Sequence, residues 1–219
     1  MRFLSKTPLL GIGALFAGAA TAAAAQADTH LFWYIARAAG LGAYLVLFIN
    51  VCLGLGVHTR IVDRVLARWQ AVDLHQFTAL LALGLLGVHL AALLADHFIG
   101  FTLPQLLVPF ASPYRPVPTA FGVVALYLLV AITASFWMRQ RIGQRAWRTL
   151  HYATFGAYVL ALLHGLLAGT DASTGWGWAL YWSTGWIVLM LTLWRFGLYQ
   201  PEVERRPAAP HRAPANSAQ

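Results

Sequence analysis

Charged residues are scarce in this sequence of 219 residues. They make up only 10% of it, whereas 59% of its residues are hydrophobic. This composition is typical of a polytopic membrane protein and excludes an ordinary soluble domain. Acidic residues are fewer than basic ones: seven Asp and Glu stand against 15 Lys and Arg, which gives a formal net charge of +8. The basic residues alternate with hydrophobic runs and form no continuous stripe, so we expect no binding to nucleic acid.

Cysteine is almost absent as well. Cys52 is the only cysteine and lies within an apolar segment, so the chain cannot form an internal disulfide. A single cysteine also excludes the Cys-x-x-Cys-His motif by which haem is attached covalently.

Long apolar runs are present instead, and about 20 such residues in a helix suffice to cross a membrane. Five runs meet this requirement: 31–56, 75–95, 117–138, 149–168 and 178–198. We therefore predict an all-α membrane protein built as a bundle of five to six transmembrane helices. The membrane domain is expected to cover 28–199, and the Pro- and Ala-rich segment 200–219 is expected to be a disordered tail.

Residues 1–27 admit two interpretations. Arg2 and Lys6 precede a Gly- and Ala-rich apolar stretch that ends in a small-x-small sequence at 25–27. This pattern is typical of a signal peptide with its cleavage site, but the stretch is also long enough for a first transmembrane helix. Both interpretations leave Asp28 on the outer side of the membrane.

The basic residues predict an orientation. Of the 15 Lys and Arg residues, all except Arg37 and Arg115 fall on one side of the predicted bundle. Cytoplasmic loops carry an excess of Lys and Arg, so this side and the C-terminal tail are predicted to be cytoplasmic. The protein is then expected to be a multi-pass protein of the inner (plasma) membrane, in contact with lipid. The helices that begin near His75 and His151 both run outward, so they are parallel.

Each of these two helices carries a second histidine. His75 and His89 are 14 residues apart, and His151 and His164 are 13 apart. At 1.5 Å of rise per residue, the two histidines of one helix lie about 20 Å apart along its axis. An ionisable side chain inside a membrane is costly and indicates function, unless it is a hydrogen-bonded packing residue. The matched depths favour two facing pairs, His75 with His151 and His89 with His164.

Two facing imidazoles are the ligands that haem iron takes at its axial positions. We therefore predict two stacked b haems, the inner one held by His75 and His151 and the outer one by His89 and His164. A step of 14 residues returns to within about 40° of the same helix face, but a step of 13 misses it by about 140°. The second helix must bend, carry a π-bulge, or present its ligands to haems that are offset sideways, and Gly156 is a candidate for the irregularity.

Other residues are candidates for contacts with the haems. Arg37 lies about two turns inside the outer face, where it would pair with a haem propionate or extend to the lipid headgroups. Arg148 and Arg145 precede His151 and are placed for an inner propionate, although cytoplasmic loops carry arginine in any case. Glycines near the ligands would let a planar group approach the backbone or would simply promote helix packing. They are Gly84, Gly87, Gly156 and Gly165.

Two motifs carry a resemblance to a known family. One is Asp73-Leu74-His75 followed by 13 residues and His89, and the other is Arg145-x-Trp147-Arg148-x-x-His151 followed by 12 residues and His164. Over residues 31–198 the sequence resembles the ferric reductase-like transmembrane domain superfamily. That superfamily includes ferric reductases, NADPH oxidases and a haem-binding membrane subunit that serves a periplasmic methionine sulfoxide reductase. The resemblance implies that the four histidines are axial ligands of two b haems.

The expected function is that of a diheme b-type membrane cytochrome. It would carry electrons from a cytoplasmic flavoprotein reductase or quinol to ferric iron, oxygen or a periplasmic redox protein. The sequence shows no Gly-x-Gly-x-x-Gly motif and no flavin domain after the last span, so flavin is expected only on a partner. Three alternatives stay open: a haem-binding subunit of a periplasmic oxidoreductase such as a methionine sulfoxide reductase, a quinone-linked respiratory diheme cytochrome, and a proton-coupled transporter without haem.

Overall fold

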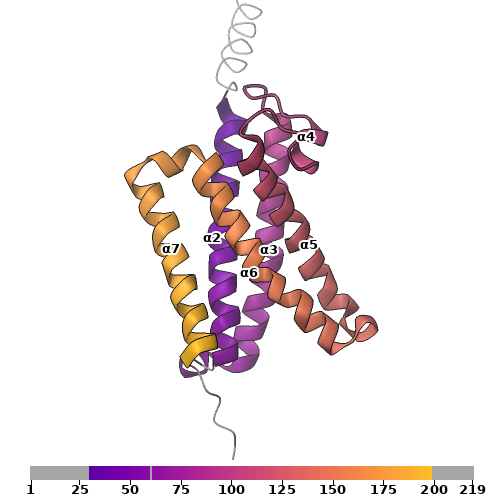
Figure 1. Ribbon diagram of the computed structural model, residues 1–219, viewed down its shortest axis with the longest axis vertical. Coiled ribbons are helices and arrows are strands. Elements are labelled where there is room, and N and C mark those ends of the chain that lie inside the picture. The colour runs from indigo at the N-terminus through magenta and orange to yellow at the C-terminus, as the bar shows by residue number, and fades with distance from the viewer. Residues whose placement is uncertain (1–29, 60, 199–219) are drawn as a thin grey trace, which may run out of the picture.

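The computed structural model describes residues 30–59 and 61–198, and the regular structure in these ranges is entirely helical (Figure 1). The long helices are α2 (Leu31–Thr59), α3 (Arg68–Ala95), α5 (Pro116–Ile142), α6 (Gln144–Ala168) and α7 (Gly175–Leu193). The short elements are η2 (Val62–Arg64), α4 (Leu103–Leu107), η3 (Thr170–Ser173) and the π-helical turn η4 (Trp194–Leu198). The predicted all-α class is confirmed. The predictions for 1–27 and 200–219 lie outside the described residues.

Four of the described helices are long and apolar enough to cross a membrane, namely α2, α3, α5 and α6. They correspond to the first four predicted spans, and they give the chain the character of a multi-pass membrane protein. The fifth predicted span, 178–198, corresponds to α7 and η4, which are not among the four. The first half of α7 is rich in tryptophan, glycine and hydroxyl residues. The fifth span therefore stays a prediction.

Local sequence signals fix where the helices at the centre of the bundle begin and end. Pro116 stands at the first position of α5, where its missing N–H costs no hydrogen bond. Gly143 alone connects α5 to α6, with a φ of +82° that favours glycine. Its N–H donates to the carbonyl of Arg139 over 3.1 Å, and its own carbonyl accepts from Trp147 N–H over 3.0 Å. This one-residue connection sets the register between α5 and α6.

The bundle consists of two antiparallel helix pairs with α7 at one side (Figure 1). α2 packs mainly along α3, and α5 packs mainly along α6. As Figure 1 shows, α3 and α6 both run upward, as the predicted histidine pairing requires. α6 crosses the bundle obliquely, so the turn between α5 and α6 diverges from the lower ends of α2 and α3.

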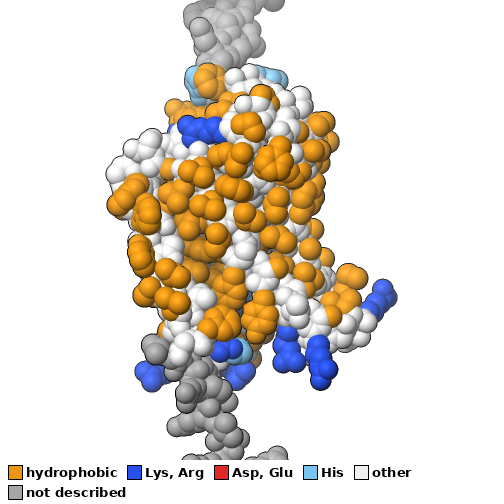
Figure 2. Space-filling model, viewed as in Figure 1, with side chains coloured by type: hydrophobic (Ala, Val, Ile, Leu, Met, Phe, Trp, Pro, Cys, Tyr) orange, Lys and Arg blue, Asp and Glu red, His pale blue; other side chains and the backbone are white. Residues whose placement is uncertain are grey.

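The outside of the bundle is covered by hydrophobic side chains, while most of the Lys and Arg side chains in view gather at its lower end (Figure 2). Large exposed apolar residues occur on all five long helices. Examples are Ile49, Phe77, Tyr127, Val159 and Met190. An apolar surface of this extent needs an apolar surrounding, which supports contact with membrane lipid.

α7 is attached to the bundle through a buried cluster of tyrosines. The hydroxyl of Tyr44 on α2 lies 2.5 Å from Thr184 Oγ1 on α7 and 3.2 Å from the hydroxyl of Tyr158 on α6. The Tyr181 ring of α7 lies 5.0 Å from the Tyr44 ring, centre to centre. The cluster therefore joins three helices through hydroxyl bonds and ring contacts.

Candidate functional site

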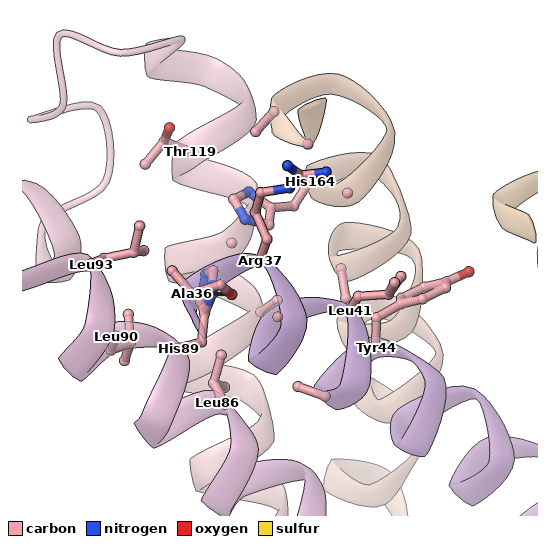
Figure 3. Close-up of a pocket in the computed structure, with 18 of the residues that line it drawn as sticks. Ala36, Arg37, Leu41, Tyr44, Leu86, His89, Leu90, Leu93, Thr119 and His164 are labelled. Carbon is pink, nitrogen blue, oxygen red and sulfur yellow. Dashed lines mark hydrogen bonds between the residues drawn. The ribbon is translucent and has the colours of Figure 1, made fainter. Parts of the chain in front are cut away.

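The four predicted histidines lie as two pairs, one above the other. In the lower pair, the ring centres of His75 on α3 and His151 on α6 are 6.1 Å apart, with 70° between the ring planes. Two imidazoles that bind one metal from opposite sides, with bonds of about 2 Å, have ring centres about 6 Å apart. In the upper pair, His89 on α3 and His164 on α6 line one cavity (Figure 3). The structure thus brings together the residues that the sequence paired.

Three of these imidazoles bond to a backbone carbonyl of the neighbouring helix. The Nδ1–oxygen distances are 3.1 Å from His75 to Asn50, 2.7 Å from His89 to Ala36 and 2.8 Å from His164 to Pro118. A carbonyl can only accept, so each Nδ1 carries the proton and donates it. The Nε2 lone pair of each ring is then left to accept a bond from a ligand.

A glycine follows each of these carbonyls by one helical turn. A Cβ built at Gly40 would lie 2.8 Å from the His89 ring, one at Gly54 would lie 3.1 Å from the His75 ring, and one at Gly122 would lie 2.8 Å from the His164 ring. Residues four apart share one helix face, so each ring rests on a patch of bare backbone beside the carbonyl to which it bonds. We call this arrangement a carbonyl–glycine cradle.

The cradles have the form in which proteins hold metal-binding histidines. A ligating imidazole almost always donates its second N–H to a carboxylate or a backbone carbonyl, which fixes the tautomer and the orientation of the ring. Among the described residues, no three His, Cys, Asp or Glu side chains gather to hold a bare metal ion. A facing pair of imidazoles can supply the two axial ligands of haem iron. The other four ligands of that iron are the nitrogens of the porphyrin.

His151 is the exception among the four. Its ring stacks on Trp147, one turn earlier on the same helix, with ring centres 5.2 Å apart and an interplanar angle of 27°. Within the described chain, its ring donates and accepts no hydrogen bond, and no glycine forms a cradle for it. The register that pairs His164 with Gly122 places Ser135 level with His151. Ser135 carries a side chain, and its hydroxyl donates to the carbonyl of Ile132 over 2.6 Å.

The 13-residue spacing on α6 is accommodated without a π-bulge. α6 is regular α-helix from Gln144 to Ala168, so Gly156 marks no such irregularity. His164 bonds through Nδ1 to a carbonyl of α5, whereas His151 lies opposite His75 on α3 and makes no such bond within the described chain.

The glycines singled out from the sequence are not the ones that contact the histidines. Gly84, Gly87 and Gly156 are exposed on the outside of the bundle, and a Cβ at any of them would meet nothing within 4 Å. Gly165 lines the upper cavity, but it packs against the Tyr181 ring. The cradle glycines lie on the partner helices. Their signal in the sequence is that Gly40 and Gly54 repeat the 14-residue spacing of His75 and His89.

The upper cavity lies between α2, α3, α5 and α6 and is mainly apolar. Figure 3 shows His89 and His164 at its centre, with Arg37 beside His164. Its apolar lining includes Leu41, Leu86, Leu90, Leu93, Val123 and Leu129. This lining would suit a flat, hydrophobic ligand held between the two imidazoles.

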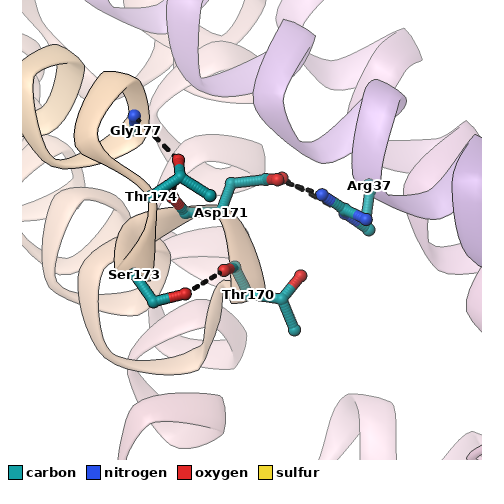
Figure 4. Close-up of polar contacts among 6 residues, drawn as sticks. All are labelled: Arg37, Thr170, Asp171, Ser173, Thr174 and Gly177. Atoms are coloured by element: carbon teal, nitrogen blue, oxygen red, sulfur yellow. Dashed lines mark hydrogen bonds and ion pairs between the residues drawn. The ribbon is translucent and has the colours of Figure 1, made fainter.

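Arg37 has a protein partner that the sequence analysis did not identify. It forms an ion pair with Asp171, in which Arg37 Nε donates to Oδ2 over 3.2 Å (Figure 4). Its guanidinium also lies 4.2 Å from the centre of the Trp33 ring. Both charged residues line the upper cavity, so the pair joins α2 to the α6–α7 loop at the cavity's edge. The predicted propionate contact stays a prediction.

The two arginines predicted to bind an inner haem propionate lie on the surface. Arg145 and Arg148 are exposed near the start of α6, and their side chains form no hydrogen bond or ion pair within the described chain. They lie at the same end of the bundle as the lower pair, and their role toward a propionate stays a prediction.

Asn50 is a site residue that the sequence analysis missed. Its side-chain amide N–H donates to the backbone carbonyl of His75 over 2.6 Å and to Thr78 Oγ1 over 2.8 Å. The backbone carbonyl of Asn50 in turn accepts a hydrogen bond from the His75 ring. An amide in the middle of an apolar span was the available signal. Asn50 therefore fixes both the backbone and the ring of His75.

Comparison with known proteins yields no relatives: no family model, no curated protein and no solved structure matches this chain.

We predict that Gly40→Ala destabilises the protein by about 1–3 kcal/mol, because the added Cβ forces the His89 ring away from its carbonyl. Thermal unfolding in detergent measures this change. Gly87→Ala is the matched control, since its Cβ points into open space and alanine favours the helix. Equal unfolding temperatures for the two variants would contradict the cradle.

Proposed function

We propose that this chain is a b-type membrane cytochrome with two haems, which carries electrons across a membrane. The observation that carries the proposal is the facing arrangement of His75 with His151 and of His89 with His164 at two levels of one bundle. The resemblance of their spacing to the ferric reductase-like superfamily supports the same assignment.

The residues at the upper site fit haem in three respects. The cradles of His89 and His164 hold both rings and direct their Nε2 lone pairs away from the backbone. The cavity between them is apolar, as the porphyrin faces require. When bound, haem supplies the reversible one-electron exchange between ferrous and ferric iron.

The protein's own contribution is ligation, orientation and exclusion of water. Two histidines at each level would hold the iron of a bound haem from both sides, which would favour electron transfer over substrate binding. The carbonyl bonds fix three of the four imidazoles, those of His75, His89 and His164, in the tautomer that a metal needs. Arg37 adds a positive charge at the upper edge, where Asp171 now neutralises it.

The proposed direction follows from the positive-inside rule. The arginine-rich lower end would lie in the cytoplasm of a cell with an inner membrane, and the His89–His164 end would lie toward the outside. The electron donor would be a cytoplasmic flavoprotein or a quinol. The acceptor would be ferric iron, oxygen or a periplasmic redox protein.

The haem content of the purified full-length protein tests the assignment of ligands. We expect two b haems per chain by pyridine haemochrome analysis. His89→Ala and His164→Ala should each lower the ratio to one, because each removes an axial ligand of the upper site. His97→Ala is the control, since this histidine is exposed in the turn after α3. A wild-type protein without haem, or variants that keep both haems, would refute the proposal.

Electron transfer across a membrane can be measured in vesicles with ferricyanide trapped inside and dithionite added outside. We expect the full-length protein to accelerate the reduction of the trapped ferricyanide. In vesicles with His164→Ala, the rate should fall to that of protein-free vesicles, because one of the two redox sites is missing. A wild-type rate no higher than that of protein-free vesicles would overturn the electron-transfer role.

A further inference from the structure

Four arginines, which we call the turn arginines, surround the short connection between α5 and α6. They are Arg139 and Arg141 at the end of α5 and Arg145 and Arg148 at the start of α6. Figure 2 shows Lys and Arg side chains projecting from the lower right of the molecule, where Figure 1 draws this turn. Three of the four are exposed, whereas Arg139 is half-buried, with its guanidinium 4.0 Å from the centre of the Phe136 ring. The turn therefore gathers four positive charges.

The turn arginines have no counter-charge in this chain. Residues 97–170 contain no Asp or Glu. Within the described chain, none of the four guanidinium groups forms an ion pair or a hydrogen bond. The other basic segment at the same end of the bundle differs in this respect, because Arg64 and Arg68 stand in a segment that also contains Asp63 and Asp73. The charges at the α5–α6 turn are therefore available to an anion from outside the chain.

The depth of the turn arginines follows from the lengths of the two helices. About 20 helical residues cross the hydrocarbon core of a membrane, whereas α5 has 27 residues and α6 has 25. Counted from the upper ends at Pro116 and Ala168, about 20 residues reach Ser135 on α5 and Thr149 on α6. All four arginines lie beyond these points, which places them at the level of the lipid headgroups.

Exposed apolar side chains accompany the arginines at the end of α5. Trp137 is 65% exposed and Met138 is 49% exposed, and Ile142 is exposed beside Arg141. Large apolar side chains are unfavourable in water, but tryptophan is enriched where headgroups meet acyl chains. An acidic soluble protein would match the arginines alone, whereas a lipid matches both the arginines and the apolar side chains. The surface therefore favours a lipid.

We propose that the α5–α6 turn is a binding site for an anionic phospholipid. The guanidinium groups bind the phosphate of the headgroup, since each guanidinium presents paired N–H donors that match two phosphate oxygens. The acyl chains lie along the exposed apolar side chains of α5. Phosphatidylglycerol carries a net negative charge, whereas the phosphate of phosphatidylcholine is neutralised by its own ammonium group, so the site prefers the former. The proposal does not rest on the proposed function, because it requires no haem.

Lipid retention by the full-length protein tests the preference. The protein is purified in micelles that contain equal amounts of phosphatidylglycerol and phosphatidylcholine, and the bound lipids are identified by native mass spectrometry. We expect at least about fivefold more bound phosphatidylglycerol, since each basic residue near a membrane surface raises the affinity for anionic lipid by about that factor. Equal retention of the two lipids would overturn the proposal and leave the charges to an acidic protein.

Two double variants test the position of the site. Arg141→Gln with Arg145→Gln should lower the excess of phosphatidylglycerol at least about fivefold, because it removes one guanidinium from each side of the turn. Arg64→Gln with Arg68→Gln is the matched control, since it removes the same charge from exposed positions at the same end of the bundle. The control should keep the excess. An equal loss in both double variants would show a diffuse attraction and overturn the site, as would an unchanged excess in the first.

Discussion

The hydrogen bond from an imidazole Nδ1 to a carbonyl of the next helix is the interaction on which this structure depends. Inside an apolar bundle the imidazole N–H needs an acceptor, and helix carbonyls already accept from the amide four residues later. An imidazole can share such a carbonyl only by approaching the helix closely. The residue one turn later must then lack a side chain, as at Gly40, Gly54 and Gly122. A histidine on one helix of each pair therefore requires a glycine at the facing position of the other helix.

This coupling fixes how the helices pair and what the site can do. Two cradles set the register of α2 against α3, and one sets the register of α5 against α6. Each ring that is held in this way has one free nitrogen directed away from its support. The absence of a cradle at His151, where Ser135 stands at the level of the missing glycine, makes the lower pair chemically different from the upper one.

Much of this arrangement could be predicted from the sequence. Apolar runs and arginine-rich loops predicted the four helices that are long and apolar enough to cross a membrane, and the histidine spacings predicted which residues would meet. The ion pair of Arg37 with Asp171 could not be predicted, because it joins residues 134 positions apart through the packing of α2 against a loop. The cradle glycines were missed for a similar reason. They lie on helices that carry none of the four paired histidines, and only the helix register assigns each glycine to its ring.

The position of iron tests the central claim most directly. An anomalous difference map at the iron edge, from crystals of the full-length protein, would show each iron without reference to the protein coordinates. The account predicts two peaks, one between His75 and His151 and one between His89 and His164. A map without iron peaks, or with peaks away from these imidazoles, would contradict it.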